Sequence, residues 1–187
     1  MDKEYVFNSF NDYSNDGISM ALRQFVQNQS DAIIVGVGSD LLVGDSLGPL
    51  TCTMIKKRCN YNFIYGTLDK PVTAKDINVL SANLKLMHPK CKIIAIDASV
   101  GSMEDVGLIK VFNRGIKPGL GVNKNLPILG DVSIVGVVAQ KTQDNSSLFN
   151  FTRLNLIYRM SEIISEGIGK YLAKDSIDKN LSLRYGL

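Results

Sequence analysis

Three apolar runs along the chain have the pattern of strands that are buried on both faces. They are DAIIVGVGS (31–39), KIIAIDAS (92–99) and DVSIVGVVA (131–139). Continuous apolar runs of this length, bounded by turn residues, are typical of strands inside a parallel sheet. A shorter strand is predicted at 62–67. The segment VGLIKVFNR (106–114) alternates between apolar and polar positions, which indicates a half-buried strand.

Apolar residues at helical spacing lie between and after these runs. One helix is predicted at 17–27. Another includes Pro49 in its first turn, where the missing N–H needs no partner, and extends to about Cys59. A third is predicted from Thr73, which can cap it, to the stop at His88-Pro89. The last helix has an inner apolar stripe made of Leu154, Ile157, Met160, Ile164, Ile168 and Tyr171.

The order of these elements predicts an α/β fold. Strands that alternate with helices favour right-handed parallel crossovers, and therefore a three-layer sandwich with a mostly parallel central sheet and helices on both faces. We expect one domain over residues 1–187, since this length fits a single core. Within it, residues 1–16 are predicted to be an N-terminal arm and residues 175–187 a mobile tail.

Composition narrows the classes of function. The net charge is only +3, and the basic residues are scattered, so nothing in the charge pattern supports nucleic-acid binding. The three cysteines have no zinc-like or CxxC spacing, the N-terminus lacks an apolar signal core, and no apolar run reaches membrane-spanning length. These features predict a reduced, soluble protein of the cytoplasm that does not bind a membrane.

The loop after the first apolar run contains the clearest candidate chemistry. It does not match a phosphate-binding motif: Leu41 stands where the dinucleotide fingerprint needs its third glycine, and Gly44 is followed by Asp45-Ser46 where a P-loop needs lysine. Instead it brings Asp45 to the carboxyl end of a parallel strand, and the run 92–99 does the same for Asp97. Ligands of open parallel sheets bind at that edge.

Asp45 and Asp97 are therefore predicted to face each other at one pocket. Two close carboxyl groups cannot both ionise easily, so one keeps its proton while the other accepts one from water or ligates a metal. This arrangement would be a general acid/base pair or half of a metal site. The simpler alternative is that Asp45 caps the following helix and Asp97 only ends a strand.

Other polar residues are weaker candidates. Ser39 and Ser99 are expected to form turns rather than to act as nucleophiles, since no GxSxG elbow is present. Lys117 lies in the glycine-rich segment 113–127, which could fold over the edge of the sheet. His88, the only histidine, lies at a predicted helix end. Asp40, Ser39, Ser99 and Lys117 are kept as candidate substrate contacts.

Four ordered motifs resemble one known family. They are GVGSDLLVGDSLGP (36–49), IIAIDAS (93–99), GIKPGLGVNKN (115–125) and DVSIVGVV (131–138). Together they resemble the germination protease of spore-forming bacteria and, more closely, the related YyaC family of sporulation proteins. The resemblance implies the fold of the hydrogenase maturation proteases. It also implies an atypical aspartic peptidase whose acidic residues match Asp45 and Asp97.

The same resemblance sets the functional expectation. It implies a sporulation-associated peptidase with a peptide or protein substrate, small acid-soluble spore proteins among the candidates, in the sporulating cell or spore. No metal and no other cofactor is expected, because His88 lies outside the matching motifs. A homo-oligomer is among the expected states of assembly. The alternative is an inactive protease fold that binds or regulates a partner.

Overall fold

The computed structural model describes residues 3–118 except for 28–31, then 128–141 and 152–185, with the backbone alone for 174–185. Its six-stranded sheet has the order β1-β5-β6-β4-β2-β3. The strands are β1 (Glu4–Asn8), β2 (Ala32–Gly36), β3 (Ile64–Tyr65), β4 (Lys92–Gly101), β5 (Leu108–Phe112) and β6 (Val132–Gln140). The neighbours β3, β2, β4 and β6 are parallel, and β5 is antiparallel to both of its neighbours. The predicted mostly parallel sheet is confirmed.

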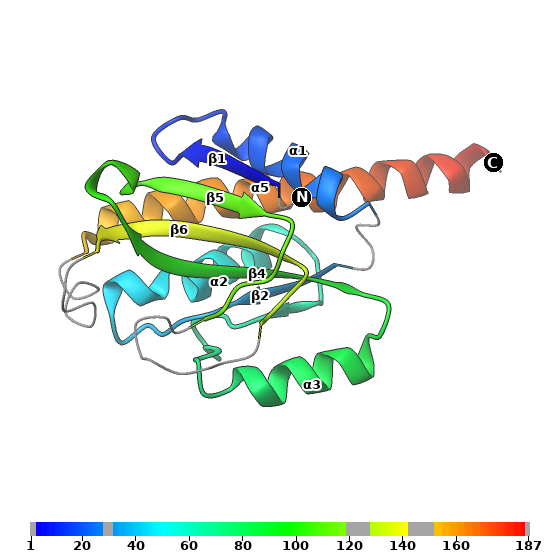
Figure 1. The fold of residues 1–187 in the computed structure, drawn as a ribbon. Helices are drawn as coiled ribbons and strands as arrows, with labels where there is room; N and C mark the ends of the chain where they lie inside the picture. The colour runs from blue at the N-terminus through cyan, green and yellow to red at the C-terminus, as the bar shows by residue number, and fades with distance from the viewer. Residues whose placement is uncertain (1–2, 28–31, 119–127, 142–151, 186–187) are drawn as a thin grey trace.

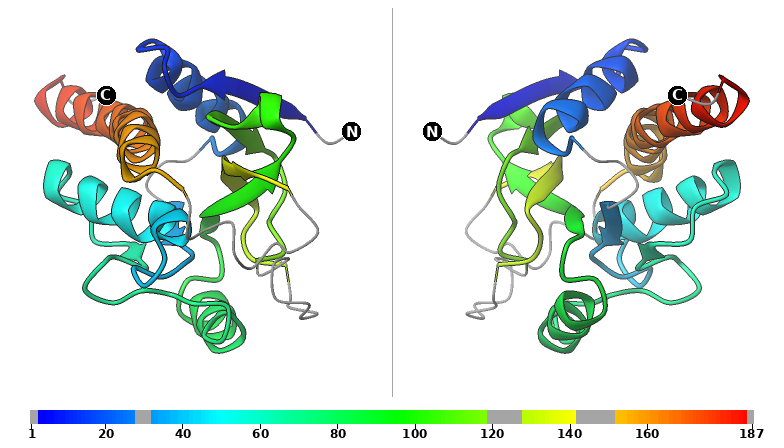
Figure 2. Two further views of the ribbon diagram at one scale, coloured as in Figure 1. Left: turned by 90° about the vertical axis from the view of Figure 1, so that its left-hand side faces the viewer. Right: turned by 90° about the vertical axis from the view of Figure 1, so that its right-hand side faces the viewer.

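Helices cover both faces of this sheet (Figures 1 and 2). The helices α1 (Ser14–Phe25), α2 (Leu47–Arg58) and α5 (Leu154–Tyr185) pack on one face around the larger hydrophobic cluster. Helix α3 (Ile77–Met87) lies on the other face, over the smaller cluster beneath β2 and β4. Two short 3₁₀ helices, η2 (Val43–Ser46) and η3 (Met103–Asp105), complete the described elements. The predicted three-layer α/β sandwich is therefore confirmed.

Strand β2 shows why the apolar runs become central strands. All five of its residues are buried, with Ile34 in the larger cluster and Ile33 and Val35 in the smaller one. Burying each such side chain stabilises the fold by about 1.5–3 kcal/mol, which only a strand covered on both faces can gain at every position. The continuous apolar pattern is thus a direct consequence of the two helical layers.

The N-terminal segment differs from the expected arm. Residues 4–8 form the edge strand β1, which pairs with β5 from Glu4↔Phe112 to Asn8↔Leu108. Helix α1 then begins at Ser14, three residues before the predicted start, and the Ser14 hydroxyl donates to the Asn8 carbonyl at 2.7 Å. Its five residues are alternately exposed and half-buried, and none is fully buried, so the strand has no continuous apolar run like those of β2 and β4 and the sequence pattern did not reveal it.

Three other expectations on helices need correction. Helix α3 begins at Ile77, because the N–H and hydroxyl of Thr73 both donate to the Asp76 carboxylate in a separate preceding turn. Helix α5 continues through the expected tail to Tyr185. Of its predicted inner stripe, Leu154 is 61 % exposed because it lies in the first turn, whereas the other five residues are fully buried.

Candidate functional site

The loop after β2 folds back on itself and places Asp45 at the end of the strand. Gly38 has a φ of +135°, a conformation that side chains other than glycine rarely adopt. A Cβ on Gly38 would lie 2.0 Å from the Asp45 carbonyl oxygen, and the Ser39 N–H donates to that same oxygen at 3.1 Å. The glycine is therefore required for the close approach that holds Asp45 beside the carboxyl end of β2.

The first turn of helix α2 packs directly against this end of the sheet. A Cβ on Gly48, in the first turn, would lie 2.3 Å from the Val37 carbonyl oxygen. The N-cap residue is Ser46. Its hydroxyl donates to the Val43 carbonyl at 2.7 Å and accepts no hydrogen bond from an N–H of the helix. Asp45 thus does not serve as the N-cap of α2, and this half of the simpler alternative is wrong.

Asp97 lies level with the carboxyl end of β2 on the neighbouring strand β4. Because β4 continues to Gly101 along β6, the expectation that Asp97 stands at the end of its strand is wrong. The Val37 N–H donates to the Ile96 carbonyl at 2.8 Å, so the loop after β2 remains bonded to β4 immediately before Asp97. Ile96 packs into the larger cluster, and strand alternation therefore directs Asp97 to the opposite face, the one that carries α3. One carboxylate oxygen accepts the Ala98 N–H at 2.9 Å.

Both carboxyl groups hold their protons more tightly than usual. Burial raises the pKa of Asp45 to about 6, although the nearby backbone N–H of Ser39 lowers it in part. Burial also raises the pKa of Asp97 to about 8, and the negative charge of Asp45 raises it further, against the lowering effect of the Ala98 N–H. At neutral pH, Asp97 is therefore mainly protonated and Asp45 mainly ionised. The structure brings these two predicted residues within electrostatic reach of each other.

This arrangement can perform acid/base chemistry. An ionised carboxylate can accept a proton from water, and a protonated carboxyl can donate one to a carbonyl oxygen or a leaving group. The different environments of Asp45 and Asp97 give each carboxyl one of these two states in the same pH range.

Three other predicted substrate contacts, Ser39, Asp40 and Ser99, lie in the loop after β2 or in β4. The Ser39 hydroxyl accepts the Leu41 N–H at 3.2 Å, which agrees with a turn-forming role. The Ser99 hydroxyl donates to the Gly136 carbonyl at 3.5 Å, a long hydrogen bond. Asp40 is exposed and has no ion pair with another described residue. Their contact with a substrate stays a prediction.

Lys117 is not brought to the aspartates by any contact between described residues. Its side chain is exposed, next to the Ile116↔Leu129 bridge that packs on the smaller cluster. Residues 119–127 of the same segment lie outside the described part of the chain, so the expectation that this segment lies over the site also stays a prediction.

His88 lies near the amino ends of β4 and β6, and the cysteines form no disulfide. The His88 ring packs edge-on against Phe63, with 5.0 Å between ring centroids, at the C-terminal end of α3. None of the three cysteines forms a disulfide, and burial raises the pKa of Cys52 to about 12. Among the described residues, no three His, Cys, Asp or Glu side chains are grouped as a metal site would need. The site is thus a carboxylate pair without a described third metal ligand.

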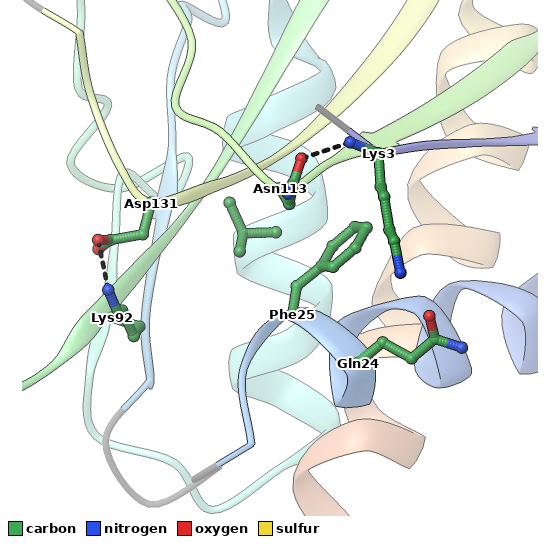
Figure 3. Close-up of a pocket in the computed structure, with 7 residues that line it drawn as sticks. Lys3, Gln24, Phe25, Lys92, Asn113 and Asp131 are labelled. Atoms are coloured by element: carbon green, nitrogen blue, oxygen red, sulfur yellow. Dashed lines mark hydrogen bonds and ion pairs between the residues drawn. The ribbon is translucent and has the colours of Figure 1, made fainter. Parts of the chain in front are cut away.

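Two hollows lie at the opposite edge of the sheet. One, of about 430 Å³, is lined by residues that include Lys3, Phe25 and Asn113 (Figure 3), and the other, of about 460 Å³, includes His88. Both are bordered by the ion pair between Lys92 and Asp131, which lie at the amino ends of β4 and β6. These hollows lie at the amino ends of β4 and β6, whereas the carboxylate pair lies level with the carboxyl end of β2.

The fold and the two carboxyl groups define an α/β protein with an acidic site at the carboxyl edge of a mostly parallel sheet. The chain belongs to the family described as "Protein of unknown function (DUF1256)", whose model matches residues 7–167. It is 35 % identical over 137 residues to "Uncharacterized protein YyaC" of Bacillus subtilis (strain 168), which covers 73 % of this chain and 67 % of that protein. The expected membership of the YyaC family is confirmed.

A solved structure also shows similarity. It is the [NiFe] hydrogenase maturation protease HycI from Thermococcus kodakarensis KOD1, with 15 % identity and a TM-score of 0.42 over 74 % of this chain and 92 % of that chain. The assignment of the fold class rests on the sheet order and on the two covered faces described above. Among the described helices, none combines the length and apolar content that a membrane crossing requires.

Proposed function

We propose that this protein hydrolyses peptide bonds with Asp45 and Asp97. The observation that supports this most strongly is the pair of carboxyl groups at the carboxyl end of β2, one from the loop after β2 and one from the adjacent parallel strand β4. Each has a raised pKa, and that of Asp97 is raised in part by the charge of Asp45. A purely structural aspartate has no need of a like-charged neighbour, whereas a general acid and a general base that work together do.

The proposed reaction divides the two proton transfers between the aspartates. Ionised Asp45 accepts a proton from a water molecule as the water oxygen attacks the carbonyl carbon of the peptide. Protonated Asp97 donates its proton to the carbonyl oxygen, which forms a neutral tetrahedral intermediate. The carbon–nitrogen bond then breaks, and the proton held by Asp45 passes to the amine that leaves. Asp97 recovers its proton as the new carboxyl group forms.

The substrate and the cellular setting are proposed from the family resemblance. Likeness to the germination protease supports a role in sporulation, with small acid-soluble spore proteins as substrates, inside the sporulating cell or spore. The carboxylate pair supports hydrolysis in general but does not select a substrate.

The direct test is incubation of the purified protein with small acid-soluble spore proteins, followed by mass spectrometry of the products. We expect cleavage at defined bonds, with kcat/KM rising through about pH 6 as Asp45 ionises and falling through about pH 8 as Asp97 loses its proton. Asp45→Asn and Asp97→Asn should each lower the rate of cleavage by about 10²–10⁴. Asp69→Asn, an exposed aspartate in another loop, is the matched control. Cleavage at an undiminished rate in both site variants would refute the assignment.

A binding or regulatory protein is the second candidate. It is favoured by the position of His88, which packs on Phe63 and adds no third titratable group to the described carboxylate pair. Binding of the same spore proteins without cleavage, at every pH tested, would select this candidate over the peptidase.

A further inference from the structure

A row of side chains leads away from Asp97 across the sheet. In the strand register, Asp97 pairs with Val135 on β6, Val135 pairs with Lys110 on β5, and Lys110 pairs with Val6 on β1. Residues paired in this way point to the same face of a sheet. We call these four residues the Asp97 row. Adjacent strands lie about 4.8 Å apart, so the row spans about 14 Å.

This row lies on the part of the sheet face that the described helices leave uncovered. Helix α3, which packs on the same face, contacts residues of β2 and β4 in the smaller cluster, and the other helices lie on the opposite face (Figures 1 and 2). Val135 is half-buried and belongs to neither cluster, whereas its neighbour Ile134 is fully buried in the larger one. Val6 is 50 % exposed.

The row is apolar next to the carboxyl group. The ammonium of Lys110 is held at 3.4 Å by Asp105, and its side chain is only 24 % exposed. With that charge paired, Lys110 presents mainly its methylene stem to the row. Beyond Asp97, the row thus consists of two valines and a hydrocarbon stem whose ammonium is paired with Asp105.

We propose that the Asp97 row is the substrate-binding surface of the carboxylate pair and that it selects an extended peptide with aliphatic side chains next to the bond to be cleaved. This inference rests on the proposed peptidase function. An extended chain advances about 3.3 Å per residue, so about four residues would span the row. Val135, the direct neighbour of Asp97, contacts the side chain nearest the reacting carbonyl and is the main specificity-determining residue.

Binding and cleavage are measured separately to test this. Cleavage sites are profiled by mass spectrometry on a mixture of denatured proteins, for the unchanged protein and for Val135→Asp. Binding is measured with Asp97→Asn protein, with and without Val135→Asp, by fluorescence anisotropy of labelled peptides that carry either an aliphatic or a serine tract. Val79→Asp, which changes an exposed valine on α3, is the matched control. If Val135→Asp does not fold, Val135→Thr replaces it, since it keeps the shape and adds one hydroxyl.

We expect aliphatic residues beside the cleaved bonds and tighter binding of the aliphatic tract than of the serine tract. Val135→Asp should raise KM and Kd for aliphatic peptides about tenfold or more, Val6→Asp should have a smaller effect, and Val79→Asp none. If Val135→Asp changes neither the cleavage sites nor KM, the inference is overturned while the proposed peptidase function stands. Peptide binding that is weakened by Val135→Asp, in a protein that cleaves nothing, would refute the peptidase function and keep the Asp97 row as a peptide-binding surface. Equal binding of both tracts, or a concentration-dependent dimer that Val135→Asp abolishes, would also overturn the inference.

Discussion

Two aspartates of the same sheet, one before the start of β6 and one in the middle of β4, show how environment assigns a role to a carboxyl group. Asp131 lies directly before β6, where one oxygen accepts the Lys92 ammonium at 2.9 Å and the other accepts the Ile93 N–H at 3.0 Å. Asp97 lies in the middle of β4, level with the carboxyl end of β2, with one described N–H donor and the charge of Asp45 nearby. The first joins the amino ends of two strands, and the second has no described cation to balance it.

This difference separates a structural carboxylate from a reactive one. A carboxylate with a cation and an N–H donor has both oxygens satisfied, and it stabilises the ends of β4 and β6. A half-buried carboxyl beside a like charge keeps its proton into the neutral pH range, which costs stability once that proton is lost. Sites that combine burial with a like-charged neighbour are where acid/base function is expected.

The largest expected difference is in catalysis. Asp97→Asn removes the proposed general acid and should lower kcat by about 10²–10⁴, because general acid/base assistance is worth that much. Asp131→Asn removes a carboxylate at the amino ends of β4 and β6 and should leave kcat unchanged. Initial rates of peptide cleavage, with circular dichroism to confirm that both variants fold, provide the measurement. Equal losses of kcat in the two variants would contradict the assignment of a catalytic role to Asp97 and a structural role to Asp131.

The next effect is the dependence of stability on pH. The folded-state pKa of Asp97 is about 8, above the ordinary value of 3.8, so folding favours the protonated form. The stabilisation is complete below about pH 4 and is lost as the pH rises through about 8, at a cost of a few kcal/mol. Urea denaturation should therefore show falling stability from mildly acidic to alkaline pH. Asp97→Asn, which does not titrate, should flatten that slope, and a slope that is unchanged in the variant would contradict the assignment.

The glycines at the carboxyl edge should be sensitive to the addition of one methyl group. Gly48→Ala places a Cβ 2.3 Å from the Val37 carbonyl oxygen and 2.9 Å from that of Ile96, and backbone atoms cannot move aside cheaply. We expect a loss of about 2–3 kcal/mol in the free energy of unfolding. Gly169→Ala in α5 is the matched control, since its Cβ would meet only the Cys59 sulfur at 3.4 Å. It should be neutral or slightly stabilising because alanine favours helix.

The smallest effect concerns the structural carboxylate. Asp131→Ala leaves the Ile93 N–H without its acceptor and should cost about 1–2 kcal/mol. Lys92→Ala should cost less than about 1 kcal/mol, because this ion pair is more than a third exposed on both sides. Thermal denaturation at neutral pH compares the two. A larger loss in Lys92→Ala would mean that the ion pair, and not the N–H bond, holds the strand ends together.

The sequence predicted the parts of the fold whose burial is uniform. Strand β2 and residues 93–96 of β4 are buried at every position, and most of β6 is buried, so their apolar runs stood out. Strand β1 has alternating exposed and half-buried residues, as an edge strand does, and was not recognised. The start of α3 was misplaced because the Asp76 carboxylate captures Thr73 in a local turn, and this competition depends on side-chain geometry.

For the site, the approach of Asp45 and Asp97 could be predicted because parallel strands end at one edge. The Asp97 row could not, because it depends on β5 lying between β1 and β6, an order that periodicity does not encode. The exposure of Val135 also depends on which part of the sheet α3 leaves open. Long-range order, more than residue chemistry, was the information that the sequence lacked.

The central claim is that Asp45 and Asp97 form a coupled pair of carboxyl groups, and titration of their side-chain carbons by NMR tests it most directly. We predict midpoints near 6 for Asp45 and near 8 for Asp97. In Asp45→Asn, the Asp97 midpoint should fall, because the neighbouring charge has been removed. Midpoints of both residues close to 3.8 in the unchanged protein, or an Asp97 midpoint that does not respond to Asp45→Asn, would contradict the account.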